Sequence, residues 1–178
     1  MPDVILTPHL STPCPAVHGI SVRLDNLDGG GLGLAYTLTG DLAALRIPEP
    51  AAPSRQDGLW RHTCFEVFIS PEGDSAYREF NFSPSGAWAA YAFRDYRDGS
   101  VLELATPPAI AYQSLDTKLE LSARLPGAVM PEGSRFRLGL SAVVESSDGN
   151  LSYWALSHPP GRPDFHHTDA FVLTLACP

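Results

Sequence analysis

Apolar residues recur at every second position along much of this chain, and this period of two restricts the fold more than any other feature. Between residues 118 and 125, three leucines and an alanine alternate with Lys, Glu, Ser and Arg. Successive side chains of a β-strand point to opposite faces of its sheet, so this segment is predicted to be a strand with one buried and one wet face. Helix is expected to be a minor component.

The same alternation predicts further strands along the chain. It occurs in residues 20–25, 34–38, 136–144 and 171–175. The 17 prolines and 15 glycines are scattered between such segments, which is typical of many strands joined by turns. Antiparallel strands with one buried face pack into two layers. The sequence therefore predicts an all-β antiparallel sandwich.

Length, charge and hydropathy limit the organisation and partners of the chain. A chain of 178 residues can bury a continuous core, so residues 1–178 are expected to form a single domain. A net charge of −8 without a Lys/Arg cluster opposes binding to nucleic acid or acidic lipid. No apolar run reaches the roughly 18 residues of a membrane span, and the N-terminus lacks a secretory pattern. A cytoplasmic protein without a membrane partner is expected, as a monomer or a dimer.

The cysteines and the most proline-rich segment carry two smaller expectations. Cys14, Cys64 and Cys177 are too few for a disulfide scaffold and show no Cys-x-x-Cys spacing, so all three are expected to be reduced. Residues 48–58, PEPAAPSRQDG, are expected to form a surface loop beside the site. A domain boundary there is the alternative, but it would leave too short a segment before it to form a core.

Residues 59–97 are expected to form three consecutive antiparallel strands, and their pairing decides which side chains share a face. An apolar core requires the first two strands to turn Phe65, Val67, Ile69, Phe80 and Phe82 inward. In the SPSG turn, a two-residue loop of Pro84 and Ser85 would pair Asn81 with Trp88. The third strand would then turn inward Ala87, Ala89, Tyr91 and Phe93.

The opposite face of these strands is predicted to be a ligand site. It would carry Cys64, Glu66, Phe68, Tyr77, Glu79, Asn81 and Trp88. Ordinary outer sheet faces carry exposed charges without a specific role. Large aromatic groups on such a face are instead either covered or used in binding, and sites commonly mix apolar walls with a few polar groups.

Two other segments are expected to frame this face. Residues 152–171 could cover the face, and they include a Pro/Gly-rich loop with the polar side chains His158, Arg162, Asp164, His166 and His167. At the start of the first strand, Trp60, Arg61 and His62 could form another edge.

Four motifs together resemble the DOMON-like superfamily, which groups family 9 carbohydrate-binding modules with haem-binding cytochrome domains, and within it a bacterial DOMON-like branch. The motifs are LW-x-x-TCFE-x-F at 59–68, E-x-N-x-SPSG-x-W at 79–88, Tyr96-Arg97, and YWAL-x-H-x-x-G-x-PDFH at 153–166. The resemblance implies a sandwich of roughly ten strands that binds a sugar or a haem on one sheet.

No cofactor is expected. Haem-binding members ligate iron through Met and His, whereas the methionines here are Met1 and Met130, the latter in an apparent turn. Calcium accompanies some carbohydrate-binding relatives, but no Asp-rich loop of the required density is present in the sequence.

The function predicted is a non-catalytic module that binds a small polar ligand, most simply a sugar. Indoles can stack on sugar C–H faces, and carboxylates and amides can bond the hydroxyls. The stacking candidates are Trp88, Trp154 and Trp60, and the hydroxyl-binding candidates are Glu66, Glu79 and Asn81. Arg61, Arg97 and His158 are peripheral candidates.

Three alternatives stay open. Glu66 and Glu79 could be the acid pair of a glycoside hydrolase. The histidines of residues 158–167, with Asp164 and His62, are suitable metal ligands but lack an ordered ligand spacing. The aromatic face could instead dock another protein.

Overall fold

A computed structural model describes residues 3–176 and contains twelve β-strands and four short 3₁₀ helices. Met1 and Cys177 lie outside the described residues. The strands are β1 (Val4–Pro8), β2 (Val17–Leu27), β3 (Gly31–Gly40), β4 (Cys64–Pro71), β5 (Tyr77–Phe82), β6 (Trp88–Asp95), β7 (Asp98–Val101), β8 (Ala109–Leu115), β9 (Lys118–Leu125), β10 (Arg135–Glu145), β11 (Leu151–Ala155) and β12 (Leu173–Ala176). The 3₁₀ helices are η1 (Leu42–Ala44), η2 (Leu59–Arg61), η3 (Gly127–Val129) and η4 (Thr168–Ala170).

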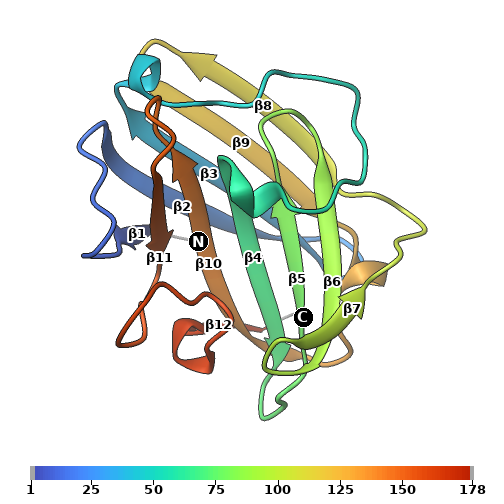
Figure 1. The fold of residues 1–178 in the computed structure, drawn as a ribbon. Helices are drawn as coiled ribbons and strands as arrows, with labels where there is room; N and C mark the ends of the chain where they lie inside the picture. The colour runs from blue at the N-terminus through green and yellow to red at the C-terminus, as the bar shows by residue number, and fades with distance from the viewer. Residues whose placement is uncertain (1–2, 177–178) are drawn as a thin grey trace.

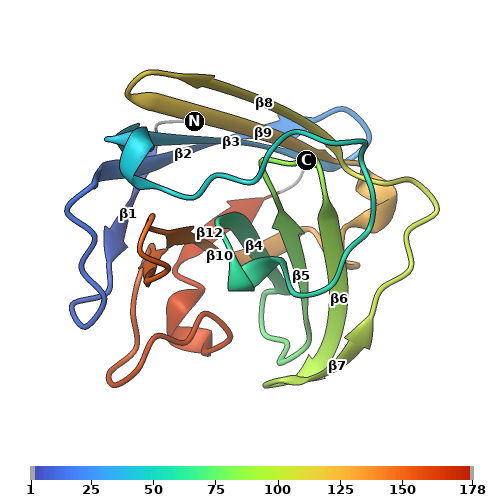
Figure 2. The same ribbon diagram turned by 45° about the horizontal axis from the view of Figure 1, so that its top comes forward.

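The strands form two layers packed face to face, which confirms the predicted antiparallel sandwich (Figures 1 and 2). One layer has the order β1-β2-β3-β9-β8, and the other has the order β7-β6-β5-β4-β10-β11. Strand β1 pairs with β2 through residues 4–6 and with β11 through residues 7–8, so it joins the two layers. Strand β12 pairs with β10.

The period of two turns one set of side chains from each layer into a shared core. The strand predicted at 118–125 is β9, and its Leu119, Leu121 and Leu125 are fully buried. In the other layer, the side chains of β4 and β5 that were predicted to point inward do lie in the core. Phe65 pairs there with Phe82, and Val67 pairs with Phe80. The core also contains Tyr36 of β3, whose buried hydroxyl donates a 2.8 Å hydrogen bond to the Glu66 carbonyl of β4. This bond satisfies the one polar atom of the ring.

The predicted register of the β5–β6 hairpin is wrong by one residue. Gly86 N–H donates to the Ser83 carbonyl and Ser83 N–H donates to the Ala87 carbonyl, each at 2.9 Å. The loop thus has three residues, with Gly86 at φ 90° in the left-handed region that favours glycine. Phe82 therefore pairs with Trp88, not with Ala87.

This slip reverses the faces of every side chain on β6, because the side-chain period of a strand is two. Trp88 lies in the core instead of on the outer face. Tyr91 and Phe93, which were expected in the core, point outward instead, and Phe93 packs against the outer-face cluster. Ala89, not Trp88, lies beside Asn81.

A second apolar cluster covers part of the outer face of β4, β5 and β10. It contains Cys64, Phe68, Tyr77, Val143, Ala155, Phe165, Ala170 and Phe171. The expectation that the C-terminal segment covers this face is confirmed by Phe165 and Phe171. Phe171 was expected to be part of the last strand, but it precedes β12 and stacks on Phe68 with ring centroids 5.8 Å apart.

Within residues 3–176, no helix combines the length and the apolar character needed to span a membrane.

Gly139 of β10 lies directly beneath Phe171, and we expect its replacement by alanine to disturb this outer cluster. A Cβ at Gly139 would stand 2.7 Å from Phe171 Cδ1. We expect Gly139→Ala to lower the free energy of unfolding by about 1–3 kcal/mol, the usual cost of an overpacked site. Urea unfolding monitored by fluorescence measures the change.

Gly19→Ala in β2 is the matched control, because the nearest atom to its added Cβ would be Thr39 Oγ1 at 3.7 Å. Its stability is expected to be unchanged or slightly increased. Equal stabilities for the two variants would contradict the close packing of Phe171 on Gly139.

Candidate functional site

A pocket of about 510 Å³ opens on the outer face of the layer that contains β4, beside the covered cluster. Its lining combines aromatic, acidic and basic side chains. The lining residues are Trp60, Glu66, Glu79, Tyr91, Phe93, Arg97, Gly99, Ser100, Val101, Val143, Tyr153, Pro163, Phe165 and His166.

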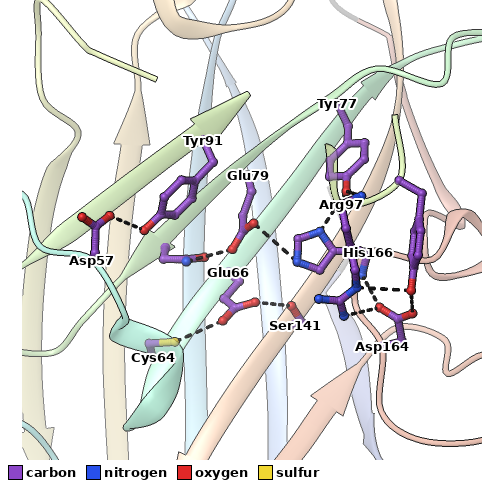
Figure 3. A network of polar contacts seen from close by, with 12 residues as sticks. Asp57, Cys64, Glu66, Tyr77, Glu79, Tyr91, Arg97, Ser141, Asp164 and His166 are labelled. Carbon is purple, nitrogen blue, oxygen red and sulfur yellow. Dashed lines mark hydrogen bonds and ion pairs between the residues drawn. The ribbon is translucent and has the colours of Figure 1, made fainter. Parts of the chain in front are cut away.

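The strand order explains how the lining is arranged. Strands β6, β5, β4, β10 and β11 are consecutive neighbours, and each directs one or two side chains into the pocket. The middle strands supply Glu66 and Glu79, whereas Tyr91 and Tyr153 come from the flanking strands. The two acids thus lie between the strands that carry the tyrosines, and Figure 3 shows them next to each other with Tyr91 beside Glu79.

The aromatic rings that line the pocket stand at steep angles to one another. Trp60 of η2 and Tyr91 of β6 have centroids 6.1 Å apart and planes inclined by 68°. On the other flank, Tyr153 and Phe165 have centroids 5.9 Å apart at 62°. Trp60 is 41% exposed, so its ring remains accessible at the rim.

The proline-rich loop is anchored beside the pocket, as expected from the sequence. Its Asp57 accepts a 2.7 Å hydrogen bond from the Tyr91 hydroxyl and is paired with Arg55 at 2.8 Å. Backbone bonds between the loop and β6 hold it at this edge, since Trp88 N–H donates to the Ser54 carbonyl and Gln56 N–H donates to the Trp88 carbonyl.

Glu66 is almost completely buried, with 2% of its surface exposed. Its carboxyl accepts a hydrogen bond from the Cys64 thiol at 3.2 Å and a long one from the Ser141 hydroxyl at 3.5 Å. Burial, and then the charge of Glu79, raise the pKa of Glu66 to about 8.

Glu79 is 5% exposed and lies next to Glu66 (Figure 3). The Asn81 amide donates to its Oε1 at 2.9 Å, and Arg97 also favours its charged form. Burial outweighs both effects and raises the pKa of Glu79 to about 7. The carbonyl oxygen of the Asn81 side chain is buried without a hydrogen-bond partner among the described residues.

His166 is a neutral group at the edge of this acidic floor. Burial and the charge of Arg97 lower its pKa to about 4, against the opposing charge of Asp164. The Tyr77 hydroxyl lies 2.8 Å from Nδ1 and accepts a 3.1 Å bond from Arg97 N–H. The Tyr77 hydroxyl can therefore donate its own proton to His166 Nδ1. The proton of the neutral His166 ring then lies on Nε2, 3.7 Å from Glu79 Oε2.

Arg97 is held by an acid of its own. Its Nη2 donates to Asp164 Oδ1 at 2.8 Å, and the Tyr96 hydroxyl donates to Asp164 Oδ2 at 2.6 Å. Burial would raise the pKa of Asp164, but these two hydrogen bonds and the charge of Arg97 outweigh it and lower the pKa. Arg97 also has φ 54°, a left-handed conformation unusual for a non-glycine residue.

The structure brings together four of the nine predicted site residues and places a fifth beside them. Trp60, Glu66, Glu79 and Arg97 line the pocket, and Asn81 contacts Glu79 beneath it. Trp88 and Trp154 lie in the core between the layers, where the Trp154 indole N–H donates to the Ser152 hydroxyl at 3.0 Å.

The two remaining residues, Arg61 and His158, are outside the lining. Arg61 is exposed in η2. The His158 Nε2 lies 2.8 Å from the Thr7 carbonyl.

Most aromatic members of the pocket were not predicted. Tyr91 and Phe93 were assigned to the wrong face, and the left-handed glycine at the end of SPSG is the signal that would have corrected the register. Tyr153 and Phe165 follow from no local pattern, because β11 and the following loop reach the pocket only through long-range packing.

The histidines of residues 158–167 do not converge as a metal site would require. The His166 ring faces Tyr77 and Glu79, whereas His167 Nδ1 accepts from Asp169 N–H at 3.2 Å. Within residues 3–176, no group of three or more His, Cys, Asp or Glu side chains is arranged to hold a metal ion.

The raised pKa values of Glu66 and Glu79 predict a pH dependence of stability. A glutamate in the unfolded chain has a pKa of about 4.3. Between that pH and about 8, Glu66 and Glu79 of the folded protein hold protons that the unfolded chain has released. The contribution of these two acids to the free energy of unfolding should therefore fall as pH rises through this interval, and the fall should be clearest above about pH 6.5, where the lowered pKa of His166 no longer has an opposing effect. Urea unfolding at several pH values measures the slope.

Glu66→Gln removes one of the two groups responsible and is expected to make this slope shallower. The exposed Glu49→Gln is the control and should retain the parent slope. Parallel curves for Glu66→Gln and the parent protein would refute the assigned burial of this carboxyl.

No protein-family model and no curated protein matches the chain. Among solved structures, it is similar to a proposed carbohydrate-binding protein from Bacteroides uniformis, with 19% identity and a TM-score of 0.70 over 99% of this chain and 86% of that one. It is also similar to a family 9 carbohydrate-binding module from Caldicellulosiruptor kristjanssonii solved with cellotriose, with 10% identity and a TM-score of 0.56 over 89% and 74% of the two chains. At these identities the likeness establishes the sandwich fold.

Proposed function

We propose that the chain is a non-catalytic module that binds a carbohydrate in the pocket above Glu66 and Glu79. The observation that carries the proposal is the combination, in one concave site, of accessible aromatic rings with buried polar groups. A sugar ring needs both, since its C–H face packs on aromatic groups and its hydroxyls need hydrogen bonds.

The volume and position of the pocket agree with a small ligand. Its roughly 510 Å³ lies within the range of ordinary small-molecule sites. The carboxyl groups are fixed by neighbouring side chains, so little side-chain entropy would be lost when they bond a hydroxyl.

Each lining group has a distinct role in the proposal. Trp60 and Tyr91 provide stacking surfaces at the rim, and Glu66 and Glu79 bond hydroxyls at the floor. Asn81 orients Glu79 through its amide. Tyr153 and Phe165 replace Trp88 and Trp154 as the apolar wall of the opposite flank.

The fold comparison gives independent support. The module from C. kristjanssonii was solved with cellotriose, and the B. uniformis protein is a proposed carbohydrate-binding protein. A sandwich of this type can thus hold a sugar, although a shared fold alone does not transfer a ligand.

Glycoside hydrolysis is the second candidate, because two acids lie together in a pocket. Such enzymes need one protonated acid and one ionised carboxylate, so their environments should move the two pKa values apart. Here burial raises the pKa of both acids, and the hydrogen-bond partners of both are neutral, so neither acid has the polar surroundings that would keep it ionised beside a protonated partner. Binding is therefore favoured over hydrolysis, and release of a fluorophore from aryl glycosides by the parent protein but not by Glu79→Gln would reverse this preference.

A thermal-shift screen against mono- and oligosaccharides, followed by calorimetry on each hit, tests the proposal. A ligand that binds only the folded state raises the melting temperature. We expect one or more sugars to do so. If no sugar does, the proposed ligand class is wrong.

Trp60→Ala is expected to weaken binding of such a sugar by about tenfold while leaving stability nearly unchanged, because the ring is at the rim. Leu115→Ala, which removes a more exposed apolar side chain on the other layer, should leave affinity as in the parent. The core variant Trp88→Ala should instead lower stability by about 3–5 kcal/mol. Unchanged affinity in Trp60→Ala would remove this ring from the site.

A further inference from the structure

We infer that the pocket prefers sugars that carry a protonated amino group to neutral sugars of the same size. The inference rests on the proposed function and names the ligand class of the same site. It follows from two buried carboxyl groups that lack a cationic partner and from the rings that stand beside them.

The hydrogen-bond partners of the two acids are neutral. Glu66 is bonded by a thiol and a hydroxyl, those of Cys64 and Ser141. Glu79 is bonded by the Asn81 amide. A buried carboxylate without a cation is expensive, so the empty site favours a proton or a positively charged ligand.

The basic side chains near the floor do not fill this role. His166 lies 3.7 Å from Glu79, but burial lowers its pKa to about 4, so it is neutral at pH 7. Arg97 donates two hydrogen bonds away from the floor, to Asp164 and to Tyr96. Arg97 therefore favours the charged form of Glu79 only through space, and among the described residues no cation is hydrogen-bonded to Glu66 or Glu79.

The raised pKa values of the two acids agree with the lack of a bonded cation. Burial raises the pKa of both groups, and the charge of Glu79 raises that of Glu66 further. An ammonium group placed between them would stabilise their ionised forms and would take the place of the protons that they hold in the empty pocket.

The aromatic walls favour the same ligand class. Ring faces carry negative potential and attract a cation within about 6 Å of the centroid. Trp60, Tyr91, Tyr153 and Phe165 line the pocket together with the two acids, so aromatic rings border the space that an amino group at the floor would enter. A neutral hydroxyl at the same place would gain neither this attraction nor an ion pair.

Calorimetric titration at pH 7.0 with two matched triplets tests the inference. They are D-glucose, D-glucosamine and N-acetyl-D-glucosamine, and the corresponding three forms of D-galactose. In at least one triplet, the free amino sugar is expected to bind at least about tenfold more tightly than both neutral members, as for a hydrogen bond to a charged group. Added NaCl should reduce this preference, since screening weakens charge pairs.

Glu79→Gln keeps the shape of the floor and removes one charge, so it should lower the ratio of the affinity for the amino sugar to that for the neutral sugar. The exposed Glu72→Gln, whose carboxylate pairs with Arg135, should keep the parent preference. Thermal unfolding verifies that each variant folds, and if Glu79→Gln does not, Glu66→Gln replaces it.

The possible results separate this inference from the proposed function. Equal affinity across a triplet, or tighter binding of the N-acetyl form, overturns the amino-group preference and leaves carbohydrate binding standing. If none of the six sugars binds and no sugar of the wider screen binds, both the amino-group preference and the proposed carbohydrate binding are overturned.

Discussion

Strand β4 is buried on both of its faces, and the rest of the molecule is organised around this constraint. Seven of its eight residues are buried, from Cys64 to Ser70. A strand of an antiparallel sandwich ordinarily has one wet face. Here the inner face packs against the other layer, and Phe171 and Phe165 belong to the cluster on the outer face. The burial of Glu66 is a consequence, because it occupies an outward position on a strand whose outer face is largely covered.

The sequence was informative wherever a pattern repeated over a whole strand. The alternation at 118–125 predicted β9 to the residue, and the need for an apolar core placed Phe65, Val67 and Phe82 on one face. The sequence pattern was insufficient at the hairpin after Phe82. One extra loop residue leaves the alternation within β5 and within β6 intact, but it exchanges the two faces of β6 relative to β5. Alanines on both faces of β6, at 89 and 90, made its own pattern ambiguous.

The acids of the candidate site and Trp60 could be predicted, whereas the other rings around the acids could not. Glu66 stands between Phe65 and Val67, and Glu79 precedes Phe80, so both acids lie beside large apolar side chains and are conspicuous in the sequence. Tyr153 and Phe165 arrive from β11 and the loop after it, and no local pattern shows where a loop will pack. The positions of these loops depend on pairs distant in sequence, such as Arg97 with Asp164 and Tyr91 with Asp57.

Strand β1 has only five residues, yet it pairs with β2 in one layer and with β11 in the other. Its partner Ala155 is almost the whole chain away from Thr7. During synthesis the N-terminus leaves the ribosome first, but this pairing can form only after β11 has been translated. Until then β1 can pair only with β2, because the edge that β11 presents to β1 does not yet exist. Closure of the sandwich is thus a late, long-range event, and a nascent chain must keep β1 and β2 from pairing with other chains until it occurs.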